Sequence, residues 1–214
     1  MKRPEDRFTI RVLYAVNRLF TRAYHELTIL RRPNLPESGR AIVVCNHISG
    51  LDPLFVQSAV DRRLITWMMA REYLATPGLG KVFQTLEIIP VDRGSRETTP
   101  LRTAVRRLTE GRVVGVFPEG GIAGGEMLPL QTGVALMAIR TKSPVFPVYL
   151  EGTQRGREMI HAFALPCQAV ISFGDPIDLS GFGHDRSELV KATALIRQGI
   201  ERERINVAEF CNVR

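Results

Sequence analysis

His47 and Asp52 are the pair of residues in this sequence whose types and spacing most clearly suggest chemistry. His47 follows an apolar run at 41–45, and four residues separate it from Asp52. A carboxylate that hydrogen-bonds one ring nitrogen of a histidine fixes its tautomer and leaves the other nitrogen free to accept a proton. The pair is therefore a candidate general base for a hydroxyl. The alternative is a histidine at a strand end, with Ser49 or Asp52 only capping a helix that begins near Gly50.

Two arginines follow other apolar runs of the chain. Arg71 comes directly after the run at 64–70, and Arg93 follows the run at 88–91 with Asp92 between. A guanidinium group at the end of a strand can bind a phosphate through two parallel hydrogen bonds. Both arginines are therefore candidate phosphate ligands, and the alternative for each is a surface salt bridge.

A glycine-rich loop follows the run at 113–117. It begins Pro118-Glu119-Gly120-Gly121 and contains two further glycines at 124 and 125. The backbone N–H groups of such a loop can form an anion-binding nest, and the alternative is an ordinary flexible turn. We expect Glu119 either to be structural or to orient this loop.

Several other catalytic classes lack their motifs here. The sequence contains no GxSxG, Walker A, GxGxxG or HExxH motif, which argues against the common serine esterases, P-loop enzymes, dinucleotide-binding enzymes and zinc proteases. Cys45 lies two residues before His47, so a Cys–His nucleophile is an alternative, although we expect a buried structural thiol. Cys45, Cys167 and Cys211 are far apart, which predicts neither a disulfide framework nor a zinc site and favours a reducing compartment.

The apolar runs alternate with helical patterns, and this alternation indicates the fold class. The runs are rich in Val and Ile and have the length of strands; they cover 41–45, 64–70, 88–91, 113–117, 145–150 and 169–173. The clearest helical patterns cover 50–60, 98–110, 131–141 and 185–205. We therefore predict an α/β fold with a mostly parallel central sheet flanked by helices. Functional residues of such folds gather beyond the carboxyl ends of the strands, where the candidates above fall.

Residues 1–32 form a basic segment that we separate from the domain at 33–214. They hold eight Lys or Arg and three Asp or Glu, in a chain of formal net charge +7. The periodicity predicts one helix over 7–24, with arginines on one side (Arg7, Arg11, Arg18 and Arg22) and apolar residues on the other (Phe8, Val12, Val16, Leu19, Phe20 and Ala23). This pattern is typical of helices that lie in a membrane interface. The alternative is a helix packed on its own domain with a solvated basic face.

Membrane-spanning and secretory segments are not expected. No run of the chain approaches the ~18 apolar residues that a spanning helix needs. No apolar segment of the signal-peptide kind follows the basic start.

Four blocks, in order, resemble the glycerolipid acyltransferase family typified by 1-acylglycerol-3-phosphate acyltransferases. They are NHISGLDP at 46–53, IPVDR at 89–93, FPEG at 117–120 and VFPV at 145–148. The stretch AREYL at 70–74 is similar to the basic stretch that follows the family's second strand. Because the blocks keep their order over residues 41–152, their combination is far more specific than any one of them.

This resemblance implies an enzyme that moves a fatty acyl chain from acyl-CoA or acyl carrier protein to the free hydroxyl of 1-acylglycerol-3-phosphate in phospholipid synthesis, without a cofactor or metal. The implied site consists of catalytic His47 and Asp52, acceptor-phosphate ligands Arg93 and Arg71, an acceptor and oxyanion loop with Glu119, Gly120 and Gly121, and an acyl site with Pro147 and Val148. The implied partners are a membrane lipid acceptor, the acyl donor and an anionic membrane surface, with no nucleic acid. The implied location is the cytoplasmic face of the cell membrane, as a peripheral or monotopic protein.

The chain departs from the family pattern at three places. Thr-Arg-Ser usually follows the FPEG block, but here Gly121-Ile122-Ala123 follows, so an expected phosphate-binding arginine is absent. The segment LQTG at 130–133 replaces one where a lysine is common, and Glu87 stands near a usual glycine. Two alternatives therefore stay open: an acyltransferase for a non-phosphate acceptor such as a lyso-aminolipid, and an idle lipid-binding protein on the same scaffold. The intact His47–Asp52 pair argues against the second.

Overall fold

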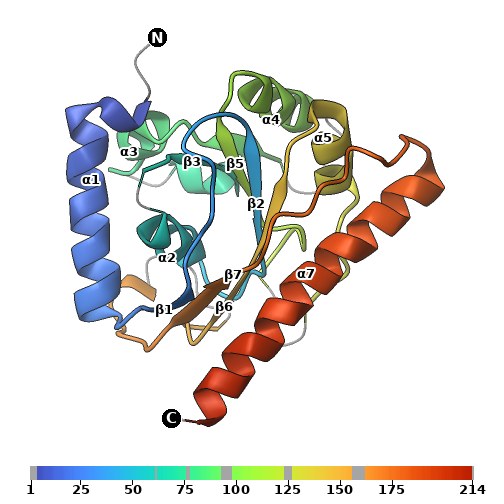
Figure 1. Cartoon of the computed structure of the whole chain (residues 1–214). Helices are drawn as coiled ribbons and strands as arrows, with labels where there is room; N and C mark the ends of the chain where they lie inside the picture. Colours follow the sequence, from blue (N-terminus) through green and yellow to red (C-terminus); the bar gives the residue numbers. More distant parts are fainter. Residues whose placement is uncertain are drawn as a thin grey trace.

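A seven-stranded sheet forms the centre of the computed structural model (Figure 1). The structure describes residues 4–60, 62–75, 78–92, 98–122, 127–155 and 162–213. The strands are β1 (Thr28–Arg31), β2 (Ala41–Cys45), β3 (Ile65–Ala70), β4 (Ile89–Val91), β5 (Val113–Val116), β6 (Val145–Glu151) and β7 (Val170–Phe173). Their order across the sheet is β1-β7-β6-β2-β5-β3-β4. Strands β2 to β6 run parallel, whereas β7 is antiparallel to β6 and parallel to β1.

Helices cover both faces of the sheet (Figure 1). One face carries α1 (Phe8–Leu19), α2 (Asp52–Ala59) and α3 (Gly80–Thr85), and the other carries α4 (Thr99–Thr109), α5 (Gly133–Thr141) and α7 (Arg186–Asn212). Short helical turns lie at Pro4–Asp6, Phe20–Tyr24 and Arg71–Ala75. Because both faces are covered, there are two apolar cores, one on each side of the sheet.

Strand β2 shows why the central strands are apolar throughout. All five of its residues are buried. Val43 and Cys45 pack in the core on the α2 side, while Ile42 and Val44 pack in the core on the α5 and α7 side. A strand with helices on both faces has no solvent-facing side, so its sequence reads as a continuous hydrophobic run.

The predicted α/β class and the mostly parallel sheet are confirmed. Each of the six expected strands is present with its ends within one residue of the prediction. The four helices predicted after the N-terminal helix are also present. The sequence pattern missed β1 and α3. Strand β1 is a four-residue strand at the edge of the sheet, and all its residues are half-buried. The local pattern of such a strand is weak, because only its pairing with β7 determines it.

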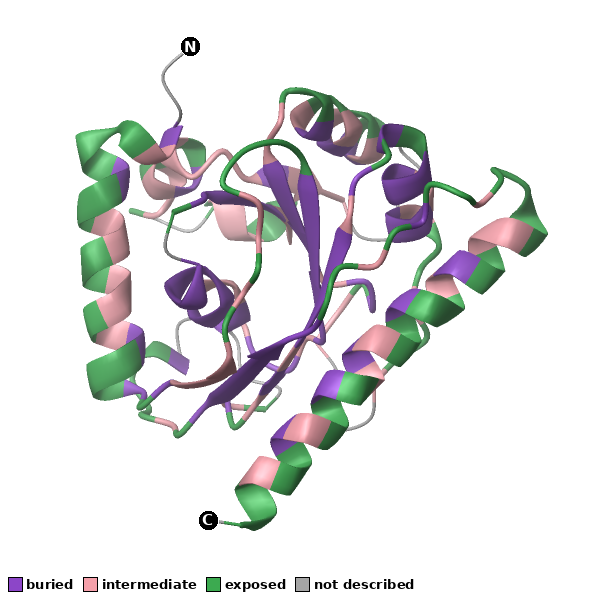
Figure 2. Ribbon diagram, in the orientation of Figure 1, coloured by how far each residue is buried: buried purple, intermediate pink, exposed green. Residues whose placement is uncertain are grey.

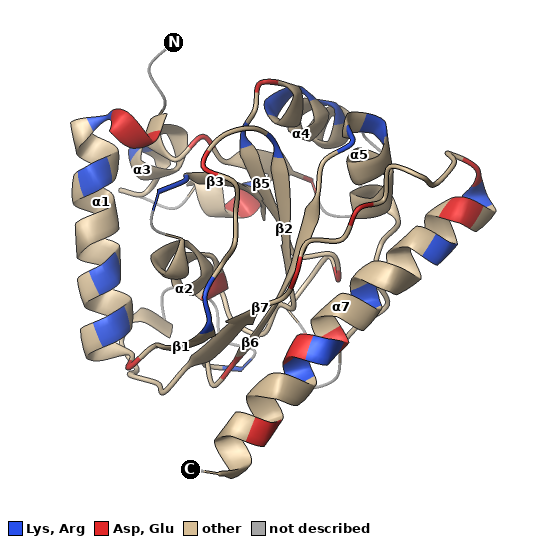
Figure 3. Cartoon of the chain, in the orientation of Figure 1, with Lys and Arg blue, Asp and Glu red and all other residues tan. Residues whose placement is uncertain are grey.

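The N-terminal helix has three sides instead of the two that its sequence suggests. It continues beyond α1 as a π-helical turn at Phe20–Tyr24. One side packs on α2: Ile10 is fully buried, Asn17 Nδ2 donates to Leu54 O (2.8 Å), and Thr21 Oγ1 lies 2.7 Å from Ser58 Oγ. The second side is the predicted arginine row, defined as Arg7, Arg11, Arg18 and Arg22 (Figure 3).

The third side of this helix is an exposed apolar row, defined as Phe8, Val12, Val16 and Leu19 (Figure 2). Their exposed fractions are 79%, 44%, 60% and 70%. The predicted apolar side is therefore not the side that packs on the domain. In the described residues, no helix is long and apolar enough to cross a membrane.

Candidate active site

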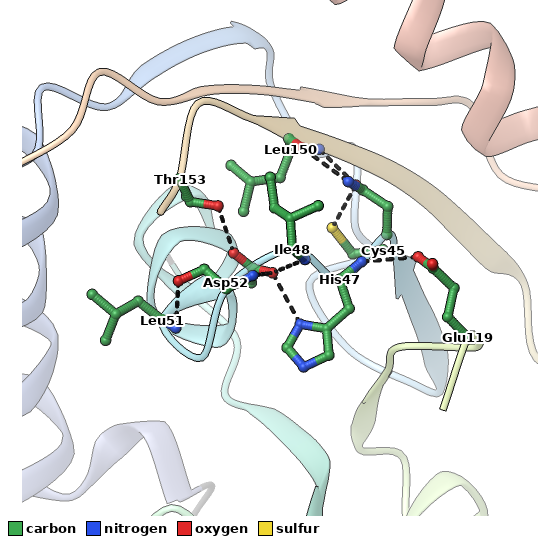
Figure 4. A network of polar contacts seen from close by, with 10 residues as sticks. Cys45, His47, Ile48, Leu51, Asp52, Glu119, Leu150 and Thr153 are labelled. Carbon is green, nitrogen blue, oxygen red and sulfur yellow. Dashed lines mark hydrogen bonds and ion pairs between the residues drawn. The ribbon is translucent and has the colours of Figure 1, made fainter. Parts of the chain in front are cut away.

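The turn between β2 and α2 brings His47 and Asp52 together (Figure 4). Asp52 is the first residue of α2 and is fully buried, and its Oδ2 lies 2.9 Å from His47 Nδ1. The same oxygen accepts the backbone N–H groups of Ile48 (2.7 Å) and Ser49 (2.8 Å). These two donors fix the carboxylate in the turn that precedes α2. The expected contact between the two side chains is thus present.

Asn46 fixes the start of this turn. Its Nδ2 donates to Leu150 O (2.9 Å), and its Oδ1 accepts the N–H of Leu150 (2.8 Å). The amide group therefore continues the pairing of β2 with β6 by one more step after the backbone has turned away. As a result, the backbone directly before His47 is fixed to the central strands of the sheet.

An aromatic stack holds the face of the His47 ring. The imidazole lies on Phe117 (ring centroids 4.1 Å apart, planes 18° apart), and Phe117 lies on Trp67 (4.7 Å, 11°). Gly115 makes room for this stack, because a Cβ atom there would lie 2.5 Å from the Trp67 ring. The ring of His47 is thus oriented by Asp52 at one edge and by Phe117 on one face.

Glu119 orients backbone groups of the site instead of lining it. Its carboxylate is buried and accepts the N–H of His47 on Oε1 and the N–H of Leu128 on Oε2, both at 2.9 Å. Burial raises the pKa of this carboxyl above its usual value. Together with Asp52, Glu119 occupies the N–H groups of residues 47, 48 and 49. An oxyanion therefore has to bind donors elsewhere.

A cavity of about 460 Å³ lies beside His47 at the carboxyl ends of the parallel strands. Its lining includes apolar side chains from three strand ends and α2, among them Pro53, Met68, Met69, Val91 and Phe117. Gly120 and Gly121 line it as expected, while Tyr73 and Gln131 are lining residues that the sequence did not reveal. Gly120 has a φ of +73°, and a side chain there would overlap the Gln131 amide, so this loop position requires glycine.

The charged groups around the cavity differ from those expected for a phosphate site. Asp92 lines the cavity, and its Oδ1 accepts a hydrogen bond of 2.6 Å from Arg71 Nε, which lowers the pKa of this carboxyl. Arg71 therefore forms the salt bridge of the alternative interpretation, at the edge of the site. Arg93 lies outside the described residues. Of the described residues that line the cavity, none is Lys or Arg.

Pro147 and Val148 are buried within the sheet and do not belong to the described wall of this cavity. Pro147 packs toward Gly174 and Gly199 on the α7 side. Val148 belongs to the core on the opposite face. The geometry does not support the expected acyl site at these two residues, since neighbouring residues of a strand point to opposite faces of a covered sheet.

Cys45 is a structural thiol in this arrangement. It is fully buried, and its Sγ contacts Asn46 Oδ1 (3.5 Å). Burial raises the pKa of this thiol well above its usual value, which keeps it protonated and unreactive. The alternative of a Cys–His nucleophile is therefore not supported.

Comparison with known proteins places these features in a family. The sequence model of the Acyltransferase family matches residues 26–151, which is more than half of the chain and includes His47, Asp52 and Glu119. The chain belongs to the Acyltransferase family. Among members with curated names, a 1-acyl-sn-glycerol-3-phosphate acyltransferase of Bacillus subtilis is 24% identical over 175 residues, covering 81% of this chain and 85% of that protein.

Two further relatives of this acyltransferase-family chain carry the same activity in their names. A 1-acyl-sn-glycerol-3-phosphate acyltransferase of Borreliella burgdorferi is 30% identical over 124 residues, covering 56% of this chain and about half (49%) of that protein. The crystal structure of the acyltransferase PlsC from Thermotoga maritima superposes with a TM-score of 0.69, at 23% identity, covering 92% of this chain and 82% of that one. At this identity, the superposition shows a shared fold.

Proposed function

We propose that this protein is a 1-acylglycerol-3-phosphate acyltransferase that uses acyl-CoA or acyl carrier protein as the acyl donor in phospholipid synthesis. The observation that carries this proposal is the His47–Asp52 pair, whose imidazole borders a largely apolar cavity. An idle lipid-binding protein would have no need of a buried carboxylate aligned on a histidine. The names of the relatives in Bacillus and Borreliella support the choice of acceptor.

In the proposed reaction, His47 acts as a general base. Its Nδ1 faces Asp52, so Nε2 is the nitrogen left to receive the proton of the acceptor hydroxyl (Figure 4). The hydroxyl oxygen attacks the thioester carbonyl, and Asp52 stabilises the imidazolium that forms. When the tetrahedral intermediate breaks its C–S bond, the imidazolium returns the proton to the leaving thiolate. The new ester and the free thiol are the products, and the histidine is neutral again.

The acceptor phosphate and the oxyanion need donors at the mouth of the same cavity. We assign the phosphate to Arg93, assisted by Arg71, as the family resemblance implies. The N–H groups at 47–49 are occupied, and that of Gly120 donates to Phe117 O (3.2 Å). Gly121 of the glycine loop is therefore the remaining described candidate for an oxyanion donor.

A second candidate function has a specific observation in its favour. The described cavity wall presents the carboxylate of Asp92 and the neutral amide of Gln131. Ile122 stands where the family usually has an arginine. Because the Asp92 carboxylate is already paired with Arg71, this wall fits an acceptor without a phosphate, such as a lyso-aminolipid, through the same base catalysis.

An acceptor screen with a radiolabelled acyl thioester separates the two functions. The proposed function predicts that wild type acylates 1-acylglycerol-3-phosphate in preference to zwitterionic lysolipids. Arg93→Ala should then lower kcat/KM for this acceptor by ~10-fold, the loss of about one charge-assisted hydrogen bond, with donor binding little changed. Acylation of a lyso-aminolipid alone, indifferent to Arg93→Ala, would assign the second function.

We also propose that α1 holds the enzyme on an anionic membrane surface at the cytoplasmic face of the cell membrane. The apolar row is exposed along the whole helix, and the arginine row lies beside it. The exposed apolar surface continues at the C-terminal end of the helix through Phe163, whose ring lies 5.1 Å from that of Phe20. Apolar side chains flanked by arginines suit a layer of acyl chains below anionic headgroups.

A further inference from the structure

Thr153 is a buried residue beside the His47–Asp52 pair that lies outside all the blocks of the family resemblance. Its hydroxyl donates a hydrogen bond of 2.9 Å to Asp52 Oδ1 (Figure 4). The other carboxylate oxygen, Oδ2, is the one that accepts His47 Nδ1. We propose that Thr153 is a positioning residue, which holds the Asp52 carboxylate in the orientation that keeps Oδ2 aligned with His47. The proposal rests on the proposed function of this pair in base catalysis.

The end of β6 positions the Thr153 hydroxyl next to Asp52. Strand β6 pairs with β2 on one side, with Val148 opposite Cys45, and with β7 on the other. Gly152 then adopts a φ of +85°, and a Cβ atom there would overlap the carbonyl of Gln168. Only glycine fits this turn, which directs Thr153 toward the first turn of α2. The hydroxyl is therefore fixed to the same central strands that carry His47.

The two oxygens of a carboxylate are chemically equivalent, so their partners alone determine the orientation of the group. Three N–H donors converge on Oδ2, and the Thr153 hydroxyl is the described partner of Oδ1. Without that hydroxyl, a buried anionic oxygen loses its donor and the carboxylate gains freedom to rotate. A rotation about the Cβ–Cγ bond moves Oδ2 away from His47 Nδ1. Small displacements of catalytic groups are known to cost large factors in rate.

The test compares Thr153→Val, which keeps the shape and removes the hydroxyl, with Thr153→Ser, which keeps the hydroxyl. Thr141→Val is the matched control, because Thr141 is equally buried (4% exposed) and lies on the other face of the sheet. Its hydroxyl donates to Met137 O (2.7 Å) in α5 and lies 2.6 Å from Ser143 Oγ. We expect Thr153→Val to lower kcat about tenfold with little change in either KM, and Thr153→Ser to recover most of it. Thr141→Val should lower the melting temperature by a similar amount and leave kcat unchanged.

A second readout needs no substrate. The imidazole Nδ1–H signal of His47 in ¹⁵N-edited NMR spectra, assigned by its loss in His47→Ala, should persist in wild type, Thr153→Ser and Thr141→Val. It should broaden or vanish through faster solvent exchange in Thr153→Val. A Thr153→Val protein with wild-type kcat and an unchanged signal overturns the proposal. If wild type acylates no acceptor, the proposed function fails, and the NMR comparison alone decides whether Thr153 positions the pair.

Discussion

At the scale of single residues, His47 is held by groups that act on different parts of its ring and backbone. Asp52 holds one edge of the ring, Phe117 stacks on one face, and Glu119 binds the backbone N–H. Each contact comes from a different element: the first turn of α2, the end of β5 and the glycine-rich loop. The remaining nitrogen, Nε2, is the part of the ring left for substrate.

Asp52→Asn is expected to keep this geometry and lose the chemistry. The Asn oxygen can accept the three N–H groups that converge on Oδ2, while its amide can donate to the Thr153 hydroxyl. The fold should therefore survive. Without the negative charge, the imidazolium is not stabilised, and kcat should fall by at least ~100-fold. Steady-state kinetics and thermal unfolding check this; normal turnover would mean that Asp52 only fixes the turn between β2 and α2.

Glu119→Gln should impair both stability and turnover. The Gln side chain offers one acceptor oxygen to two part-buried N–H groups, those of His47 and Leu128, and turns its amide toward the other. The loss of one such bond predicts a decrease of about 1–3 kcal/mol in the free energy of unfolding. We expect kcat to fall about tenfold, since the His47 backbone shifts. Glu209→Gln, exposed on α7, is the control. Equal denaturation curves for both variants would contradict the role of Glu119.

The sequence predicted those site residues that lie close together in the chain. His47 and Asp52 meet because four residues and a helix start bring them together, which local patterns can reveal. Thr153 reaches Asp52 across 101 residues, and Gln131 and Tyr73 enter the cavity from other elements, so only the folded sheet shows them. Pro147 and Val148 show the converse, because a motif on a strand does not indicate which of its residues face a cavity.

At the scale of elements, α1 is the helix for which the structure adds most to the prediction from sequence. The pattern predicted one apolar and one basic side. The structure assigns the packing on α2 to a third side, with Ile10, Asn17 and Thr21. Arg22 also takes part in that packing, since its Nη2 donates to Ser58 O (3.0 Å). The apolar row is exposed, whereas the arginine row includes a residue that packs on α2. Substitutions in the apolar row therefore test membrane binding with less effect on the fold.

Replacing Phe8 and Leu19 together by Ser should release the protein from anionic vesicles. These two side chains are the most exposed of the apolar row, so the fold should tolerate the change. Each fully buried side chain of this size contributes about 1.5–3 kcal/mol on leaving water, which predicts a loss of at least ~10-fold in vesicle affinity. Flotation with phosphatidylglycerol vesicles measures it.

The matched control for this test lies on α7. Val190 and Ile205 are also exposed, although to a lesser degree (55% and 47%), so Val190→Ser with Ile205→Ser removes apolar surface from another helix. This control should float like wild type. If the α1 variant floats equally well, the membrane contact lies elsewhere and the apolar row has another role.

At the scale of the whole molecule, the parallel sheet collects the site at one edge. His47 follows β2, Met69 lies at the end of β3, and Asp92 follows β4. The glycine loop follows β5, and Thr153 follows β6. Helix α1 lies on α2, whose first turn carries Asp52 and the cavity-lining Pro53. The exposed apolar row of α1 lies on another side of this helix from the residues that pack on α2.

The most direct measurement is the rate of acyl transfer by His47→Ala from a labelled acyl thioester to 1-acylglycerol-3-phosphate. His184→Ala, at an exposed position before α7, is the control for the loss of an imidazole. If His47 is the general base, transfer should fall by at least ~100-fold in His47→Ala and stay at the wild-type rate in His184→Ala, with both variants folded and still binding the donor. A folded His47→Ala protein that transfers acyl groups within a few-fold of wild type would contradict the account.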